Sequence, residues 1–206
     1  MEQLRKVTGV AAPMLRINID TDQIIPARFL VRITEEGLGA SLFYNWAHLP
    51  DGAPNPEFLL NRQPWTGAVI LLADRNFGCG SSREAAPRAL RQFGFRSVIA
   101  PSFGGIFYNN CFRNGILPVQ LDIDHIKALA AELEPTPAQG VTVDLETEMV
   151  STPGGQRYAF TAPRLMRRML LEGLDEVALT ETFGAQIKEF RDQDGVRRPW
   201  VYHIGE

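Results

Sequence analysis

The chain is poor in the residues that most often bind metals in proteins. Its 206 residues include two cysteines, Cys79 and Cys111, and three histidines, His48, His125 and His203. Two thiols cannot supply the three or four cysteine ligands of an iron–sulfur cluster, and the histidines show no metal-ligand spacing. We therefore expect no metal site within this chain, and two free thiols in a cytosolic protein.

The chain also lacks an excess of positive charge and long apolar runs. Its net charge of −3 offers no basic stripe for nucleic acid. No apolar run is long enough to cross a membrane, and residues 1–6 lack the apolar core of a signal peptide. A hydrophobic share of 45% in 206 residues is ordinary for one globular domain. We expect a cytoplasmic protein with neither a nucleic-acid nor a membrane partner.

The most informative segment runs from residue 74 to residue 83 and reads DRNFGCGSSR. It follows an apolar run at 68–73 and precedes an alanine-rich stretch, which predicts a buried strand, a tight loop and a helix start. Open α/β sheets bind ligands at the carboxyl ends of strands. Ser81 and Ser82, close to a helix N-terminus, lie in positive potential that suits an alkoxide or a carboxylate. Arg83 adds a planar fork of donors that fits a carboxylate.

A simpler interpretation of this segment stays open at this point. Ser81 or Ser82 could be the N-cap of the helix, with Arg83 or Glu84 on a solvated first turn. The segment is not a dinucleotide-binding fingerprint, because Arg83 occupies the position of the third glycine, and no phosphate-loop lysine follows.

Apolar periodicity and turn residues predict the other elements. Strands alternate with helices at first and pair as a hairpin later, which predicts a layered α/β domain with a mixed sheet. We expect one domain over residues 1–190 and a C-terminal tail over 191–206. The expected elements are a strand opening 15–25, an irregular segment at 34–64 with exposed aromatic residues including Phe43, a helix to 93, a strand at 97–100, a helix at 103–113, a strand at 116–121, a helix capped by Asp124 and ending at 133, strands at 141–150 and 157–160, and helices at 163–172 and 175–190.

Three segments together resemble a known family. They are DTDQIIPARFL at 20–30, NFGCGSSRE at 76–84 and PSFGGIFYNNCFRNGILP at 101–118. In this order and spacing the chain resembles the small-subunit family of 3-isopropylmalate dehydratase, which corresponds to the swivelling domain of aconitase. The resemblance covers about residues 3–190. It implies a swivelling β/β/α layered domain that docks as a lid on a larger subunit, in a heterodimer or a higher assembly.

The resemblance also implies the chemistry. In this family 2-isopropylmalate is dehydrated to 2-isopropylmaleate and rehydrated to 3-isopropylmalate, in leucine biosynthesis. A [4Fe-4S] cluster on the large subunit binds the substrate hydroxyl as a Lewis acid. The resemblance therefore implies that this chain binds no cofactor itself and is inactive alone.

Four residues match catalytic positions of the family. Ser81 matches the serine that removes the proton from the carbon next to a carboxylate, and Ser82 matches a neighbouring serine that forms hydrogen bonds at the site. Arg83 matches an arginine that holds a substrate carboxylate. Asp22 matches an aspartate that orients groups of the site; its other interpretation is a turn or cap residue before Pro26.

Further residues are candidates for substrate binding. Gly80 belongs to the loop whose backbone amides can stabilise the Ser81 alkoxide. Arg28 and Arg32 are candidate carboxylate ligands, with a solvated surface role as the alternative for each. We expect the substrate loop over about residues 32–64. Cys79 lies beside the site and is expected to be a small buried residue, because dehydration needs no covalent sulfur step.

The chain departs from the family pattern at several positions. Ala85 and Arg88 replace a histidine and a tryptophan of many members, and Gly104 and Gly105 replace an Ala-Asp pair. These departures leave other branched 2-hydroxy diacids open as substrates, such as citramalate or a dimethylmalate, and the segment 32–46 should discriminate among them. A third hypothesis is that the chain is a non-catalytic binding or regulatory partner. The presence of all four residues that match catalytic positions argues against it.

Overall fold

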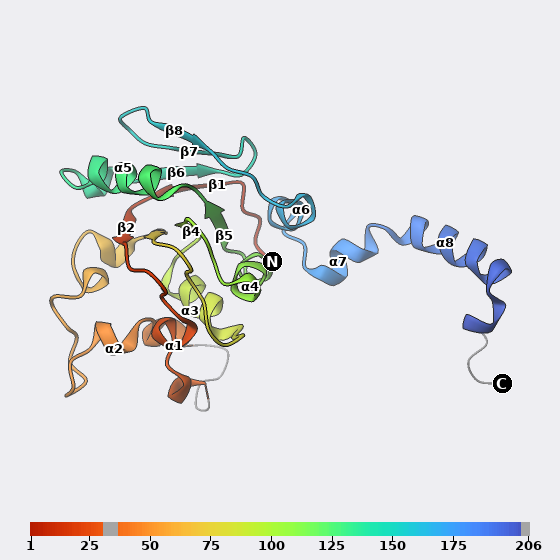
Figure 1. The fold of residues 1–206 in the computed structure, drawn as a ribbon, viewed down its shortest axis with the longest axis horizontal. Helices are drawn as coiled ribbons and strands as arrows, with labels where there is room; N and C mark the ends of the chain where they lie inside the picture. Colours follow the sequence, from red (N-terminus) through yellow and green to blue (C-terminus); the bar gives the residue numbers. More distant parts are fainter. Residues whose placement is uncertain (31–36, 203–206) are drawn as a thin grey trace.

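Eight short strands form two separate sheets in the computed structural model, which describes residues 1–30 and 37–202 (Figure 1). One sheet is parallel with the order β2-β3-β4-β5, and the other is antiparallel with the order β1-β6-β7-β8. The combination of parallel and antiparallel pairing that the sequence predicts is thus divided between two sheets. The strands are β1 (Lys6–Gly9), β2 (Ala11–Met14), β3 (Ile70–Ala73), β4 (Ser97–Ala100), β5 (Leu117–Gln120), β6 (Val141–Asp144), β7 (Met149–Ser151) and β8 (Arg157–Ala159).

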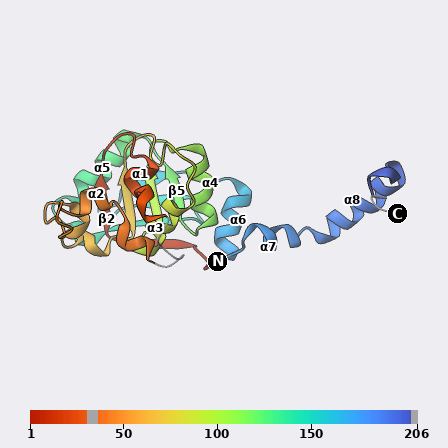
Figure 2. The same ribbon diagram turned by 90° about the horizontal axis from the view of Figure 1, so that it is seen from below.

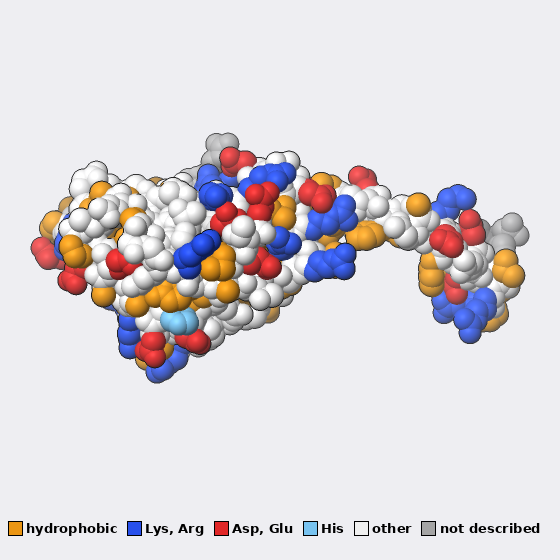
Figure 3. Space-filling view, turned by 90° about the horizontal axis from the view of Figure 1, so that it is seen from above, with side chains coloured by type: hydrophobic (Ala, Val, Ile, Leu, Met, Phe, Trp, Pro, Cys, Tyr) orange, Lys and Arg blue, Asp and Glu red, His pale blue; other side chains and the backbone are white. Residues whose placement is uncertain are grey.

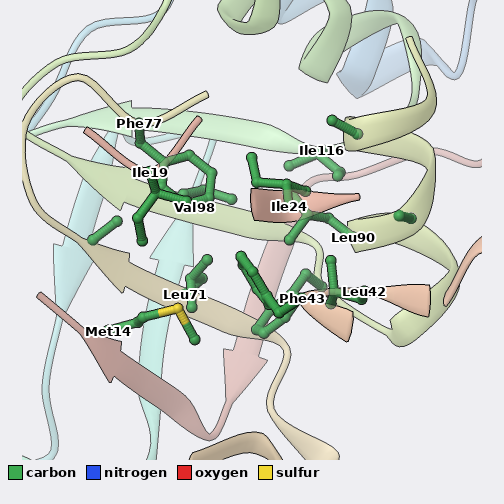
Figure 4. Packing of buried hydrophobic residues seen from close by; sticks show 14 of the residues in the cluster. Met14, Ile19, Ile24, Leu42, Phe43, Leu71, Phe77, Leu90, Val98 and Ile116 are labelled. Carbon is green, nitrogen blue, oxygen red and sulfur yellow. The ribbon is translucent and has the colours of Figure 1, made fainter. Parts of the chain in front are cut away.

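The parallel sheet has a hydrophobic core on each of its faces. Every residue of β3 and β4 is buried, as expected of strands in a sheet that is covered on both sides. Leu71 of β3 and Val98 of β4 belong to the core that faces α1 and α3 (Figure 4). Leu72 and Ile99 belong to the second core, which faces α5 and the antiparallel sheet. The result is the layered arrangement visible in Figure 1.

The helices that cover the parallel sheet end where the sequence predicts. Helix α3 ends before Gly94, and α4 is followed by Asn114 and Gly115, residues typical of helix C-termini. The α-helices are α1 (Thr21–Ile24), α2 (Tyr44–Ala47), α3 (Ala85–Phe93), α4 (Gly105–Arg113), α5 (Ile123–Leu133), α6 (Arg164–Glu172), α7 (Glu176–Glu181) and α8 (Gly184–Arg197). The 3₁₀-helices are η1 (Ala27–Phe29), η2 (Leu38–Ser41), η3 (Leu59–Asn61), η4 (Trp65–Gly67), η5 (Pro137–Gln139) and η6 (Pro199–Val201). None of the helices in the described part of the chain has the length and apolar character needed to cross a bilayer.

Two strand predictions are wrong in position. The strand expected at the start of 15–25 lies earlier, at β2, and the chain then enters a loop and α1, which the Asp20 side chain caps. The strand expected at 141–150 is two strands, β6 and β7, joined by a turn. The Asp144 carboxylate makes this turn by accepting hydrogen bonds from the amides of Glu146 and Thr147 at 2.9 and 3.0 Å.

Other details also differ from the sequence predictions. Asp124 lies in the first turn of α5, whose N-cap is Asp122. Phe43 is fully buried, although the sequence suggests an exposed aromatic residue. The helix expected at 175–190 is divided into α7 and α8. The described part of the predicted irregular segment, residues 37–64, consists of short helical turns and loops, as expected.

The C-terminal helices extend away from the two sheets as an arm. Figures 1 and 2 show α7 and α8 leaving the body beyond α6, and Figure 3 shows hydrophobic side chains among charged ones on the arm. Helix α8 continues through residue 191 to Arg197, so the chain is helical across the predicted start of the tail. At its end, Arg198 and Tyr202 bind the Asp194 carboxylate, at 2.7 and 2.9 Å. The division into a domain at 1–190 and a tail at 191–206 stays a prediction.

Candidate active site

The segment 74–84, called the serine loop below, connects the carboxyl end of β3 to α3. The loops that follow β2 and β4 lie on its two sides. On one side, the Gly78 amide donates to the Ile19 carbonyl at 2.7 Å. On the other side, the Phe77 amide donates to the Ser102 carbonyl at 3.1 Å, and the Gly104 amide donates to the Phe77 carbonyl at 2.9 Å. The serine loop is therefore held by strand-like pairing from both neighbours.

Two asparagines add a second connection that the sequence analysis missed. Asn18 and Asn76 both have left-handed backbones, with φ of 56° and 61°. The Asn76 side-chain amide donates to Asn18 Oδ1 at 2.9 Å, and its backbone amide donates to Ser102 Oγ at 2.9 Å. Asparagine tolerates this backbone region better than most residues, which is the only local signal in the sequence. These bonds link the loops after β2, β3 and β4.

Glycine is required at two positions of the serine loop. Gly78 has a φ of +70°, and a Cβ atom there would overlap the ring of Phe107, a residue of α4 that is 3% exposed. Gly80 has a φ of +87°, and a Cβ atom there would lie 3.4 Å from Cβ of Asp20. These glycines let the loop pass closely between α4 and the start of α1. Gly80 is thus placed where the sequence predicts, and its contact with substrate stays a prediction.

The two serines lie on the surface where the loop approaches α3. Ser81 and Ser82 are exposed, and the N-cap of α3 is Glu84, whose side chain makes no capping hydrogen bond. The interpretation of either serine as the N-cap is therefore wrong, because the helix begins three residues after Ser82, at Ala85. The two hydroxyls therefore do not cap α3. They belong to residues three and four positions before Ala85, on the side of the helix N-terminus, whose partial positive charge favours negative charge.

Asp22 and Arg83 come together although 61 residues separate them in the sequence. The guanidinium of Arg83 donates two parallel hydrogen bonds to the carboxylate of Asp22, from Nη1 to Oδ1 and from Nη2 to Oδ2, the latter at 2.8 Å. Asp22 Oδ1 also accepts a hydrogen bond from the amide of Ala27 at 3.3 Å. The Arg83 side chain is 17% exposed and that of Asp22 is 53% exposed. The aspartate thus fixes the arginine beside the two serines, and the guanidinium keeps further N–H donors for a ligand.

Arg28 lies on η1 and contacts α2. Its Nη2 atom donates to Asn45 Oδ1 at 2.6 Å, and its guanidinium stacks over the rings of Phe29 and Tyr44 at 4.8 and 5.3 Å. The side chain is exposed and held by these aromatic residues, so its role toward a substrate carboxylate stays a prediction. Arg32, the other candidate carboxylate ligand, lies outside the described residues, as does part of the predicted substrate loop.

The two thiols are held in their neutral form. Burial raises the pKa of the Cys111 thiol well above its ordinary value. Burial, followed by the nearby Asp20 carboxylate, raises the pKa of Cys79. A protonated thiol is neither a strong nucleophile nor a metal ligand. In residues 1–30 and 37–202, no three or more His, Cys, Asp and Glu side chains form a group that could hold a metal ion.

The two serines are exposed, and neither they nor Asp22 and Arg83 line the apolar cavity of about 420 Å³ near α5. That cavity is lined by residues of β2, η4 and the C-terminal half of α5, including Pro13, Trp65 and Leu133. Near the serine loop, Ile17 and Ile106 are 48% and 56% exposed on the loop after β2 and on the first turn of α4.

Comparison with known proteins identifies the family of the chain. Residues 1–124 match the model of the aconitase C-terminal domain family. The chain is 51% identical over 208 residues to a 3-isopropylmalate dehydratase small subunit of Cupriavidus necator, covering 100% of both chains. It is 48% identical to the small subunit of Shewanella oneidensis, covering 90% of this chain and 94% of that one.

A solved structure supports the same family at the level of the fold. The 3-isopropylmalate dehydratase structure from Methanocaldococcus jannaschii superposes with a TM-score of 0.64 at 25% identity, covering 89% of this chain and 98% of that chain. The expected swivelling α/β domain and the resemblance read from the three sequence segments are both confirmed. The chain therefore belongs to the aconitase C-terminal domain family and, within it, to the family of 3-isopropylmalate dehydratase small subunits.

Proposed function

We propose that this chain is the small subunit of a hydro-lyase that isomerises 2-isopropylmalate to 3-isopropylmalate through 2-isopropylmaleate, in leucine biosynthesis. One observation carries the proposal. In a chain 51% identical to a 3-isopropylmalate dehydratase small subunit, two exposed serines and an arginine fixed by Asp22 stand at the carboxyl ends of parallel strands. This arrangement can take a proton from a substrate and hold its carboxylate.

The proposed proton transfer involves Ser81. In dehydration, a proton leaves the carbon next to a carboxylate, and hydroxide leaves the neighbouring carbon as the double bond forms. We assign the acceptance of that proton to Ser81 Oγ, and its return to the substrate on rehydration. A serine oxygen accepts a proton only where its alkoxide is stabilised, which the loop amides, the N-terminal end of α3 and the Arg83 guanidinium can do. Ser82 would donate a hydrogen bond to the same site.

Arg83 and Asp22 have separate roles in this proposal. Arg83 binds one carboxylate of the diacid through the N–H donors that Asp22 leaves unused, which are Nε–H and the second N–H of an Nη atom. Asp22 accepts two hydrogen bonds from Arg83 and so fixes the plane of the guanidinium. We assign Asp22 to the orientation of Arg83 and not to the transfer of a proton.

The proposal requires a second subunit. Two cysteines, one of them fully buried in α4, do not form a ligand set for a [4Fe-4S] cluster, so we place the cluster on the large subunit. That cluster would supply a Lewis acid for the substrate hydroxyl. The open serine loop and the exposed Ile17 and Ile106 support a large subunit that covers this edge of the sheet. We place the complex in the cytoplasm, with a small diacid as its substrate.

Reconstitution of the complex tests the proposal. The chain is co-expressed with its large subunit, purified without oxygen, and assayed on 2-isopropylmalate beside citramalate and 2,3-dimethylmalate, with each subunit alone as a control. We expect turnover only in the complex and the highest kcat/KM on 2-isopropylmalate. The free chain should remain colourless after incubation with iron and sulfide.

The other outcomes assign the chain differently. A higher kcat/KM on citramalate or dimethylmalate would assign it to a related dehydratase and direct attention to Ala85, Arg88 and Gly105, which depart from the family pattern. Stoichiometric cluster binding by the free chain would contradict the two-subunit assignment. A complex that forms and turns over none of the three diacids would favour a binding or regulatory role.

A further inference from the structure

Thr21, the first residue of α1, is bound to the serine loop through both its backbone and its side chain. Its amide donates a hydrogen bond to the Cys79 carbonyl at 2.9 Å. Its hydroxyl donates to the Ser81 carbonyl at 3.0 Å. Thr21 is 1% exposed, and its hydrogen bond to the exposed Ser81 is partly buried. One buried residue therefore holds two carbonyls of the loop, on either side of Gly80.

The bond to Ser81 determines which way the next peptide unit faces. The peptide between Ser81 and Ser82 is trans, and the carbonyl and the amide of a trans peptide point in opposite directions. Because the Ser81 carbonyl points inward to Thr21, the Ser82 amide points outward. No oxygen in the described residues accepts a hydrogen bond from the Ser82 amide. The loop thus presents an unused backbone donor at the residue that follows Ser81.

We propose that Thr21 is a positioning residue for the dehydration, because its hydroxyl turns the Ser82 amide toward the substrate carboxylate next to the carbon that loses its proton. Negative charge builds on that carboxylate as the proton leaves, and a fixed N–H donor stabilises it. Thr21 itself touches neither the substrate nor the transferred proton. This inference rests on the proposed function and adds a residue to it.

The side chain of Thr21 can be tested by a closely matched pair of variants. Thr21→Val keeps the shape and removes the hydroxyl, whereas Thr21→Ser keeps the hydroxyl and removes a methyl group. Ser97→Ala is the control, because the buried Ser97 hydroxyl also donates to a backbone carbonyl, that of Leu117, at 2.8 Å. Ser97 begins β4, at the end of the sheet opposite the serine loop. Thr21→Ala replaces Thr21→Val if the valine variant does not fold.

The measurements are kcat and KM on 2-isopropylmalate for each complex at equal cluster content, with the melting temperature of each variant. We expect Thr21→Val to lower kcat by up to roughly 10²-fold with KM within about twofold of wild type, in line with the loss of one transition-state donor. Thr21→Ser should restore most of kcat, and Ser97→Ala should lower the melting temperature without lowering kcat. A wild-type kcat for Thr21→Val, or an equal loss in Thr21→Ser, would overturn the proposal.

Crystal structures of the free wild-type chain and of Thr21→Val separate this inference from the proposed function. We expect the Ser81 carbonyl to face residue 21 in the wild type and to turn away in the variant. An unchanged carbonyl in the variant would overturn the positioning role even if the complex proves active. If the wild-type complex turns over no diacid, the proposed function fails, while the structures still decide what Thr21 does to the loop.

Discussion

Replacement of Gly78 by alanine should destabilise the protein strongly. The backbone of Gly78 has a φ of +70°, where a residue with a Cβ atom costs about 1–2 kcal/mol. The new methyl group would also overlap the ring of Phe107, and overpacking of a buried site costs about 1–3 kcal/mol. We therefore expect the free energy of unfolding to fall by roughly 2–5 kcal/mol, out of a typical total of about 5–15 kcal/mol.

Urea unfolding followed by circular dichroism measures this difference, and Gly105→Ala is the matched control. Gly105 is the first residue of α4, its φ lies outside the left-handed region, and a Cβ atom there meets no atom within 4 Å. We expect the control to lie within about 0.5 kcal/mol of wild type or slightly above it, since alanine favours helices more than glycine. If Gly78→Ala also lies within about 0.5 kcal/mol of wild type, the close packing of the serine loop against α4 is not what holds the loop.

Two further predictions concern charged groups. Arg83→Lys should raise KM and lower turnover in the complex, because an ammonium cannot reproduce two parallel hydrogen bonds to a carboxylate; wild-type kinetics would mean that Arg83 is only a partner for Asp22. Burial raises the pKa of Asp144, but hydrogen bonds from Thr147 and the Lys6 ammonium outweigh it, so its pKa lies below the ordinary value of 3.8. The stability that wild type has over Asp144→Asn should therefore be constant above about pH 5 and shrink as the pH falls below about 4, in acid unfolding of the two proteins. A difference independent of pH between 2 and 6 would contradict this account of Asp144.

The region around the serine loop could be predicted because its signals are local. A continuous apolar run predicts β3, and Gly94 and Gly115 mark where α3 and α4 end. β2 could not be predicted in this way, because it is four residues long and contains Pro13, so it shows no strand period. The neighbouring alternation at 15–19 indicated a strand instead, although Ile17 there is an exposed loop residue.

The residues of the site could be predicted only in part from the sequence. The resemblance selected Asp22 and Arg83 from distant segments, and the structure joins them by two hydrogen bonds. The pair of Asn18 and Asn76 and the bond from Thr21 to the serine loop were missed. These bonds connect loops that are neighbours only after the sheet has formed, and a hydroxyl or amide that binds a distant backbone leaves no periodic pattern in the sequence.

The most direct test of the account is the rate of 2-isopropylmaleate formation by complexes that carry Ser81→Ala or Ser82→Ala. Both serines are exposed, so neither change should alter folding or assembly, which sedimentation of the two complexes can verify. We predict that Ser81→Ala lowers kcat by about 10²–10⁴-fold or more, the usual effect of losing a proton-transfer group, and that Ser82→Ala lowers it less. A Ser81→Ala complex with the wild-type subunit ratio, cluster content and kcat would contradict the assignment of Ser81 as the base.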